Sequence, residues 1–84
     1  MYYVYVLKSK KDSGFYVGYT KDLKGRIKEH RAWRVDSTKN RLPMELVYYE
    51  ASLNSKDATK RERYLKTSWG KRYIKGRLEN YLTG

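Results

Sequence analysis

The sequence predicts a small α/β domain of the α+β type, with a three-stranded mixed or antiparallel sheet flanked by about three helices. Short runs of aromatic and β-branched residues at 2–8, 15–19 and 44–51 alternate as strands do. The segments between and after them carry apolar residues at i, i+4 spacing, which is typical of helices that pack on one side. The order β-β-α-β-α-α contains no internal repeat or linker, so a single domain over residues 1–84 is expected.

The alternation in the first strand assigns a side of the sheet to each residue. Tyr3, Tyr5 and Leu7 are expected on one face of residues 2–8, and the residues between them on the other. The turn signal Asp-Ser-Gly at 12–14 follows, and the second strand begins directly after it. The two strands are therefore expected to form a hairpin.

Capping residues and apolar spacing place the first helix and the loop after it. Thr20 is expected to cap a helix in which Leu23 and Ile27 face inward at i, i+4. The polar run at 34–43 ends in the only proline and is expected to form the loop before the third strand.

Two further helices are expected in the C-terminal third of the chain. Asn54 or Ser55 is placed to cap the second helix, which is expected to run to about Trp69, where Gly70 interrupts it. The last helix carries apolar residues at i, i+4 spacing, namely Ile74, Leu78 and Leu82.

Charge and composition narrow the classes of partner. Twenty basic residues against nine acidic ones give a net charge of +11, which favours a polyanionic partner. The chain has no cysteine, which excludes disulfides, thiolate zinc sites and cysteine nucleophiles. No apolar run approaches the roughly 20 residues that span a bilayer. The N-terminus lacks the features of a signal peptide. A soluble, cytoplasmic protein without a membrane partner is expected.

Arg26 and His30 lie four residues apart on the first predicted helix, so their side chains project next to each other. They are expected about a quarter turn or more away from the inward pair of Leu23 and Ile27. By themselves they are more typical of a solvated polar face, so the pair alone does not indicate a function.

Glu62 has an unusual position on the second predicted helix. Ala58, Leu65 and Trp69 form its expected inward stripe, and Glu62 falls in the middle of that stripe at about 100° per residue. A carboxylate among apolar residues is costly unless it is paired or bound to a cation.

Two interpretations of Glu62 remain open from the residues alone. One is a structural salt bridge to Arg26 or another arginine. The other is a ligand for magnesium, a hard cation that often takes only one or two protein carboxylates. Glu50 and Glu79 are competing candidates, but both are expected to be more easily solvated.

The tyrosines complete a candidate site. Tyr5 and Tyr16 could share a face of the hairpin, with Gly18 leaving room for a ligand or backbone to approach. Each tyrosine alone also fits ordinary aromatic packing. A phenol titrates near 10, so it would need Arg26 or a metal beside it to accept a proton near neutral pH. Two phenols, a guanidinium, an imidazole and a carboxylate are groups that phosphodiester hydrolysis can use.

In this order, these residues resemble the GIY-YIG nuclease domain, and specifically its small stand-alone bacterial members. "YVY" at 3–5 and "YVG" at 16–18 stand where the family has its two signature tripeptides. "DLKGRIKEH" at 22–30 is similar to the family's helix with an arginine and a histidine. "STKNRLPMELVYYEA" at 37–51 resembles the loop and third strand of the small members. "DATKRERYLK" at 57–66 is similar to the helix with the metal-binding glutamate.

The resemblance implies a metal-dependent endonuclease that uses Mg²⁺ or Mn²⁺. Carried over by position, Tyr5 would be the general base, Tyr16 would orient water or the phosphate, and Arg26 would stabilise transition-state charge. His30 would support the phosphate or leaving group, and Glu62 would hold the metal. The chain departs from the pattern at the glycine of the first tripeptide, which Tyr3 replaces. A late asparagine of several family enzymes has only Asn80 as a candidate here.

Nucleic acid, DNA rather than RNA, is the expected partner. A protein partner could supply specificity, because no base-reading element accompanies the domain. The alternatives are a nucleic-acid-binding module that cuts weakly or not at all, and a small interaction protein. Basic residues around the proposed site are the expected contacts to nucleic acid: Lys8, Lys21, Lys24, Arg31, Lys39 and Arg41.

Overall fold

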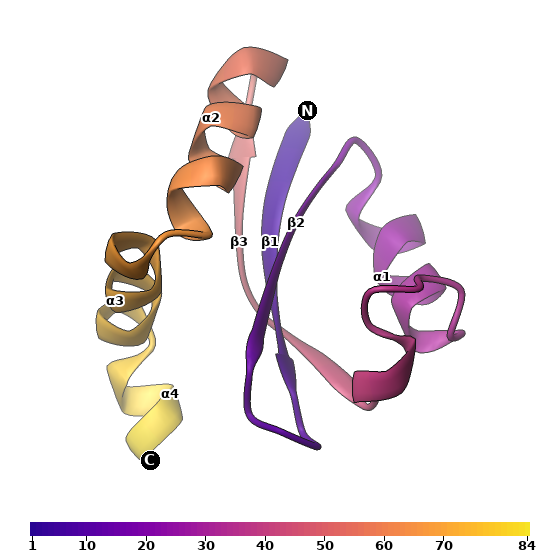
Figure 1. Ribbon diagram of the computed structural model, residues 1–84. Coiled ribbons are helices and arrows are strands. Elements are labelled where there is room, and N and C mark those ends of the chain that lie inside the picture. The colour runs from indigo at the N-terminus through magenta and orange to yellow at the C-terminus, as the bar shows by residue number, and fades with distance from the viewer.

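The computed structural model describes all 84 residues and confirms the predicted α+β class (Figure 1). The observed order agrees with β-β-α-β-α-α, except that the last helix is divided in two. In chain order the elements are β1 (Tyr2–Ser9), β2 (Phe15–Thr20), α1 (Leu23–Arg31), the 3₁₀ turn η1 (Lys39–Arg41), β3 (Met44–Ser52), α2 (Ser55–Leu65), α3 (Ser68–Arg77) and α4 (Glu79–Thr83).

The sheet is antiparallel throughout, with the strand order β2-β1-β3. The predicted hairpin pairs β1 with β2, and β3 lies along the other side of β1, so a mixed sheet is excluded. Tyr5 in the central strand is paired with Gly18 of β2 and with Tyr49 of β3. Residues paired in this way share a face of the sheet, which fixes what surrounds Tyr5.

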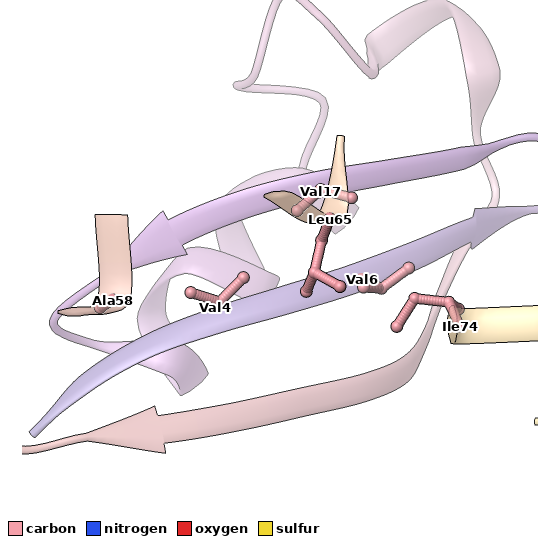
Figure 2. Close-up of a cluster of buried hydrophobic side chains, with 6 residues drawn as sticks. All are labelled: Val4, Val6, Val17, Ala58, Leu65 and Ile74. Carbon is pink, nitrogen blue, oxygen red and sulfur yellow. The ribbon is translucent and has the colours of Figure 1, made fainter. Parts of the chain in front are cut away.

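Helices cover both faces of the sheet, as seen along its edge in Figure 1. α1 lies on one side and α2, α3 and α4 lie on the other. Figure 2 shows the core under α2 and α3, made of Val4, Val6, Val17, Ala58, Leu65 and Ile74. The core under α1 contains Tyr5, Leu7, Ile27 and Met44. The alternation of β1 thus sends its odd-numbered residues to α1 and its even-numbered residues to α2, as predicted.

The cap of α1 differs from the prediction. Asp22, not Thr20, is the N-cap, and its carboxylate accepts from the amide of Gly25 at 3.1 Å. The Thr20 hydroxyl instead accepts from the amide of Asp22 at 3.0 Å, in a turn that precedes the helix. An aspartate is as good a cap as a threonine, and the turn at Thr20 decides between them.

The second predicted helix ends earlier than expected. α2 stops at Leu65, and Thr67 caps α3 by accepting from the amide of Gly70 at 3.1 Å. Gly70 therefore lies inside α3, where a Cβ would collide with the backbone of Tyr64 and Leu65. Trp69 is on α3 and is 68% exposed, so its assignment to the inward stripe was wrong.

A network of polar side chains ties β3 to α2 and α3. The guanidinium Nε of Arg61 donates to both oxygens of Glu50, at 2.9 and 3.0 Å, and the hydroxyl of Tyr48 donates to Glu50 at 2.7 Å. The guanidinium also lies over the rings of Tyr64 and Tyr73, at 5.2 and 4.6 Å from their centroids. Glu50 is therefore held by an arginine and is not the easily solvated carboxylate that was expected.

None of the helices has both the length and the apolar character needed to cross a membrane.

Candidate active site

The phenol of Tyr5 and the imidazole of His30 form the centre of the candidate site. The Tyr5 hydroxyl lies 2.8 Å from Nε2 of His30, and their rings meet edge to face at a centroid distance of 5.6 Å. Both residues are buried, Tyr5 on the face of the sheet that α1 covers and His30 on α1 itself. The burial of His30 corrects its expected place beside the inward stripe. A buried imidazole is stable there because each ring nitrogen has a polar partner.

Thr38 supplies the second partner of that imidazole. Its hydroxyl lies 2.7 Å from Nδ1 of His30, and it is fully buried in the loop after α1. The same hydroxyl is 3.5 Å from the carbonyl of Val35, to which it can only donate. His30 is thereby held between the loop and the sheet.

Arg26 lies on the same flank of α1, one turn before His30. Its Nε donates to the Tyr5 hydroxyl at 3.4 Å, and its Nη1 is 3.5 Å from the carboxylate of Glu29. Its side chain is 34% exposed. Both contacts are long, so the guanidinium is only loosely held and faces solvent.

These contacts have one consistent direction of donation. Arg26 can only donate, so the phenol oxygen of Tyr5 accepts from it and keeps its own hydrogen for Nε2 of His30. Nδ1–H of His30 then donates to Thr38, which donates to the carbonyl of Val35. This tautomer is assigned from the network of hydrogen bonds.

Burial makes both central groups neutral at neutral pH. Burial lowers the pKa of His30, and the positive charge of Arg26 lowers it further. Burial also raises the pKa of Tyr5 to about 12; the hydrogen bond from Arg26 opposes this rise. A neutral imidazole and a protonated phenol are the states that the assigned donor chain requires.

Tyr16 and Gly18 position the phenol from β2. Tyr16 packs against Tyr5 and His30, with ring centroids 6.3 and 5.2 Å away. The ring of Tyr5 passes over Gly18, where a Cβ would overlap its Cζ and hydroxyl. The expectation that Tyr5 and Tyr16 share a face is confirmed. Because β2 is an edge strand, the phenol is directed toward the edge of the sheet.

Glu62 reaches this region from α2, which covers the opposite face of the sheet. It lies between Ala58 and Leu65 on the helix, both of which are fully buried. Its own side chain is 20% exposed, and its Oε2 is 3.3 Å from Nζ of Lys66. Burial is the main cause of the raised pKa of Tyr5, and the charge of Glu62 makes a minor contribution to it. Of the two interpretations left open for Glu62, the salt bridge to an arginine is not observed, because its ion pair is with Lys66.

The site has a buried centre, Tyr5 and His30, and three more exposed side chains that form its rim, Tyr16, Arg26 and Glu62. Tyr5 has no exposed surface and His30 is 1% exposed, whereas Tyr16, Arg26 and Glu62 are half-buried. The half-buried side chains can therefore contact an incoming ligand without a change in the packing of Tyr5 or His30.

Glu62 is the candidate ligand for a divalent cation. The protein has no group of three or more His, Cys, Asp or Glu side chains that could enclose a metal. Mg²⁺ binds through one or two carboxylates, with waters and substrate phosphates as its other ligands. Glu62, a half-buried carboxylate, is a side chain that could hold an ion in a site of this open kind.

The basic residues expected to contact nucleic acid do not lie on one surface. Lys21, Lys24 and Arg31 are exposed along α1, whereas Lys8 lies beyond the other face of the sheet, in a hollow near α3 and α4. The remaining two are in ion pairs, Lys39 with Asp36 at 3.3 Å and Arg41 with Asp12 at 3.1 Å.

Sequence reasoning missed two residues of the site. Thr38 lies in a loop without periodicity, and nothing in the sequence pointed to it. Lys66 was not identified either, although its i, i+4 spacing from Glu62 could have revealed their ion pair.

Known proteins are similar to this chain over most of its length. A family model described as the GIY-YIG catalytic domain matches residues 1–82. A UPF0213 protein of Clostridium perfringens is 43% identical over 67 residues, which cover 79% of this chain and 71% of the relative. A UPF0213 protein of Staphylococcus haemolyticus is 40% identical over 67 residues, covering 79% and 80%. No solved structure gives a significant match.

Proposed function

Because this chain belongs to the GIY-YIG catalytic domain family, a family of nucleases, we propose that it is a divalent-metal-dependent endonuclease with little intrinsic sequence specificity. The observation that carries the proposal is the meeting of Tyr5, His30 and Arg26 at one edge of the sheet. Hydrogen bonds of 2.8 and 3.4 Å join the phenol to the other two side chains.

Arg26 is the proposed phosphate-binding residue. Its contacts to Tyr5 and Glu29 are long, and it is 34% exposed, so a phosphate oxygen can replace both partners. Charged hydrogen bonds to phosphate are shorter and stronger than those it makes now. When Arg26 turns toward a phosphate, it uncovers the hydroxyl of Tyr5.

Tyr5 is the proposed general base, and His30 is its proton partner. The phenol donates to Nε2 of His30, so the imidazole can hold the phenolic proton while the phenolate oxygen accepts one from water. A pKa of about 12 makes this loss unfavourable in the resting protein. Added positive charge beside the phenol would lower that pKa.

Glu62 is the proposed metal ligand at the rim of the site, with Mg²⁺ or Mn²⁺ as the ion. A divalent cation bound there would neutralise charge on the phosphate and favour the ionised form of Tyr5. The ammonium group of Lys66 contacts one oxygen of this carboxylate. A bound cation would therefore displace Lys66 or use the other oxygen of Glu62.

DNA is the proposed substrate, with selection by structure or by a protein partner. The net charge of +11 supports attraction to nucleic acid without reading its sequence. The alternative is a binding module that cuts weakly or not at all. The complete resting Tyr5–His30–Thr38 chain favours the enzyme, since stacking and charge alone need no such chain.

A panel of labelled duplex, nicked, flapped and single-stranded DNA and RNA, incubated with magnesium, tests this function. We expect cleavage of one or more structures by the wild type, and none by Glu62→Ala, which still binds them. Binding without cleavage across the panel by the wild type would replace the enzyme with the binding module.

A further inference from the structure

A basic groove runs along the flank of α1 that faces away from the candidate active site. Three hollows of about 340, 270 and 360 Å³ follow one another along the helix. The first and second share Leu23 and Lys24, and the second and third share Arg31. They form one continuous depression between α1 and β3.

Positive charge lines the groove at helical spacing. Lys24, Lys28 and Arg31 follow one another at intervals of four and three residues, which places them on one side of α1. All three are exposed, and none is in an ion pair. The lining contains one carboxylate, Asp22, which already accepts from the amide of Gly25 as the helix cap.

Aromatic side chains stand at both ends of the groove. Tyr49 is 54% exposed at one end and packs near Tyr3 at a centroid distance of 6.3 Å. Trp33 is 69% exposed at the other end. Between them the floor is apolar, with Ile27 and Leu46 in the lining.

The backbone conformation of Trp33 sets where its side chain stands at this end of the groove. Trp33 has a φ of 64°, in the left-handed region that glycine normally occupies after a helix. The amide of Arg34 donates to the carbonyl of Glu29 at 3.0 Å, which closes the end of α1 and accounts for this conformation. The amide of Trp33 donates to the carbonyl of His30 at 3.2 Å, so it is attached directly to the active-site helix.

We propose that this groove binds an unpaired strand of nucleic acid, with bases stacked on Trp33 and Tyr49 and phosphates bound by Lys24, Lys28 and Arg31. The inference rests on the proposed function for its ligand class. Exposed aromatics with an apolar floor suit unpaired bases, whereas a duplex presents mainly phosphates to a shallow surface. The nine residues of α1 span about 13 Å, or roughly four stacked nucleotides.

The groove would allow this domain to select a substrate by its structure. α1 directs Arg26 and His30 to one flank and the basic groove lies along the other. A strand held in the groove lies one helix diameter from the scissile phosphate at Arg26. The enzyme would then prefer DNA with an unpaired segment beside the cut, such as a flap or a junction.

Affinity for a short labelled single strand, measured by fluorescence anisotropy without divalent metal, tests the groove. The groove variant is Lys24→Gln/Lys28→Gln/Arg31→Gln. The matched control is Lys56→Gln/Lys60→Gln/Arg63→Gln, which removes the same charges at the same spacing from exposed positions of α2. We expect the groove variant to lose at least about tenfold in affinity, and the control about twofold. The salt dependence should fall by about 2 in slope for the groove variant.

Intrinsic fluorescence tests the stacking directly. Trp33 and Trp69 are equally exposed, at 69% and 68%, and are the only tryptophans. In Trp69→Phe, which keeps Trp33, an unlabelled single strand should quench the emission. In Trp33→Phe, which keeps Trp69, quenching should be weak.

Equal losses of affinity in the two triple variants, or equal quenching of the two tryptophans, would overturn the groove. Melting curves of each variant confirm that a loss is not caused by unfolding. The two proposals fail separately. Selective loss by the groove variant in a protein that cuts nothing would leave the groove and remove the nuclease. Cleavage with equal binding losses would do the reverse.

Discussion

Two networks of tyrosine and arginine lie on opposite faces of the same sheet, and they differ in what the arginine binds. On the face covered by α2 and α3, the guanidinium of Arg61 donates to both oxygens of Glu50, at 2.9 and 3.0 Å. It also lies over the rings of Tyr64 and Tyr73. On the face covered by α1, the guanidinium of Arg26 lies 3.4 Å from the hydroxyl of Tyr5 and 3.5 Å from the carboxylate of Glu29. The first arginine is satisfied within the fold, and the second is available to a ligand.

The tyrosines of the two networks differ in the same way. Burial raises the pKa of both Tyr5 and Tyr48. Tyr48 donates to the ionised carboxylate of Glu50 at 2.7 Å, where a proton cannot be passed on without neutralising a stable ion pair. Tyr5 donates to a neutral imidazole, which can take a proton. A tyrosine beside an arginine therefore marks a reactive site only where its proton has an acceptor.

The largest expected effect is the difference between substitutions of Arg26 and of Arg61. Arg26→Ala should lower the cleavage rate by roughly 100-fold to 1000-fold, because it removes a donor aimed at charge in the transition state. The melting temperature should change little, since both contacts of Arg26 are long. Steady-state cleavage and thermal unfolding of the same preparation measure the two effects. A rate close to that of the wild type would show that Arg26 does not contact the phosphate.

Arg61→Ala should have the opposite profile. Loss of its guanidinium leaves Glu50 partly buried and unpaired, which should lower the free energy of unfolding by about 2 kcal/mol. Urea titration measures this value, and the cleavage rate of the folded fraction should stay near that of the wild type. An unchanged stability would mean that the network does not hold β3 to α2.

The strands and the shared face of Tyr5 and Tyr16 could be predicted because alternation in a strand decides the side of each residue. Periodicity in a helix is less decisive. His30 lies beside the Leu23 and Ile27 stripe by angle, yet it is buried, since Tyr5 and Thr38 supply its hydrogen bonds. That requirement depends on a loop whose path the sequence does not give.

The errors in α2 and at Glu50 have different causes, one local and one long-range. The inward stripe was extended to Trp69 because the capping threonine at 67 was not recognised as a helix start. Glu50 was judged solvated because its partner, Arg61, is eleven residues away on another element. Long-range pairs of this kind do not appear in any periodic pattern.

The pH dependence of stability gives a smaller effect that separates the two faces. In the unfolded chain the imidazole of His30 takes up a proton near pH 6.5, whereas in the folded protein its pKa is lower. The unfolded state therefore binds more protons, and stability should fall as the pH drops below about 6.5. His30→Gln should remove this slope. His30 is the sole histidine, so its NMR titration gives the pKa directly, and a value above 6.5 would contradict the burial argument.

The smallest expected effect concerns the carboxylate beside Arg26. Glu29→Gln removes a partner at 3.5 Å that competes with a phosphate for the guanidinium. Affinity for a DNA duplex should rise by about twofold to threefold, in keeping with the modest free energy of an exposed ion pair. Asp57→Gln on α2 adds the same charge far from the site and is the matched control. Equal gains in both variants would indicate a general charge effect.

The most direct measurement compares the loss of one hydroxyl on each face, in Tyr5→Phe and Tyr48→Phe. Both substitutions remove a hydroxyl that donates a hydrogen bond, at 2.8 Å from Tyr5 and 2.7 Å from Tyr48, and leave the ring in place. We expect Tyr5→Phe to lower the rate of magnesium-dependent cleavage by roughly 100-fold or more. Tyr48→Phe should lower the free energy of unfolding by about 1 kcal/mol and leave the cleavage rate unchanged. Equal cleavage rates for the two folded variants would contradict the assignment of Tyr5 as the group that accepts a proton from water.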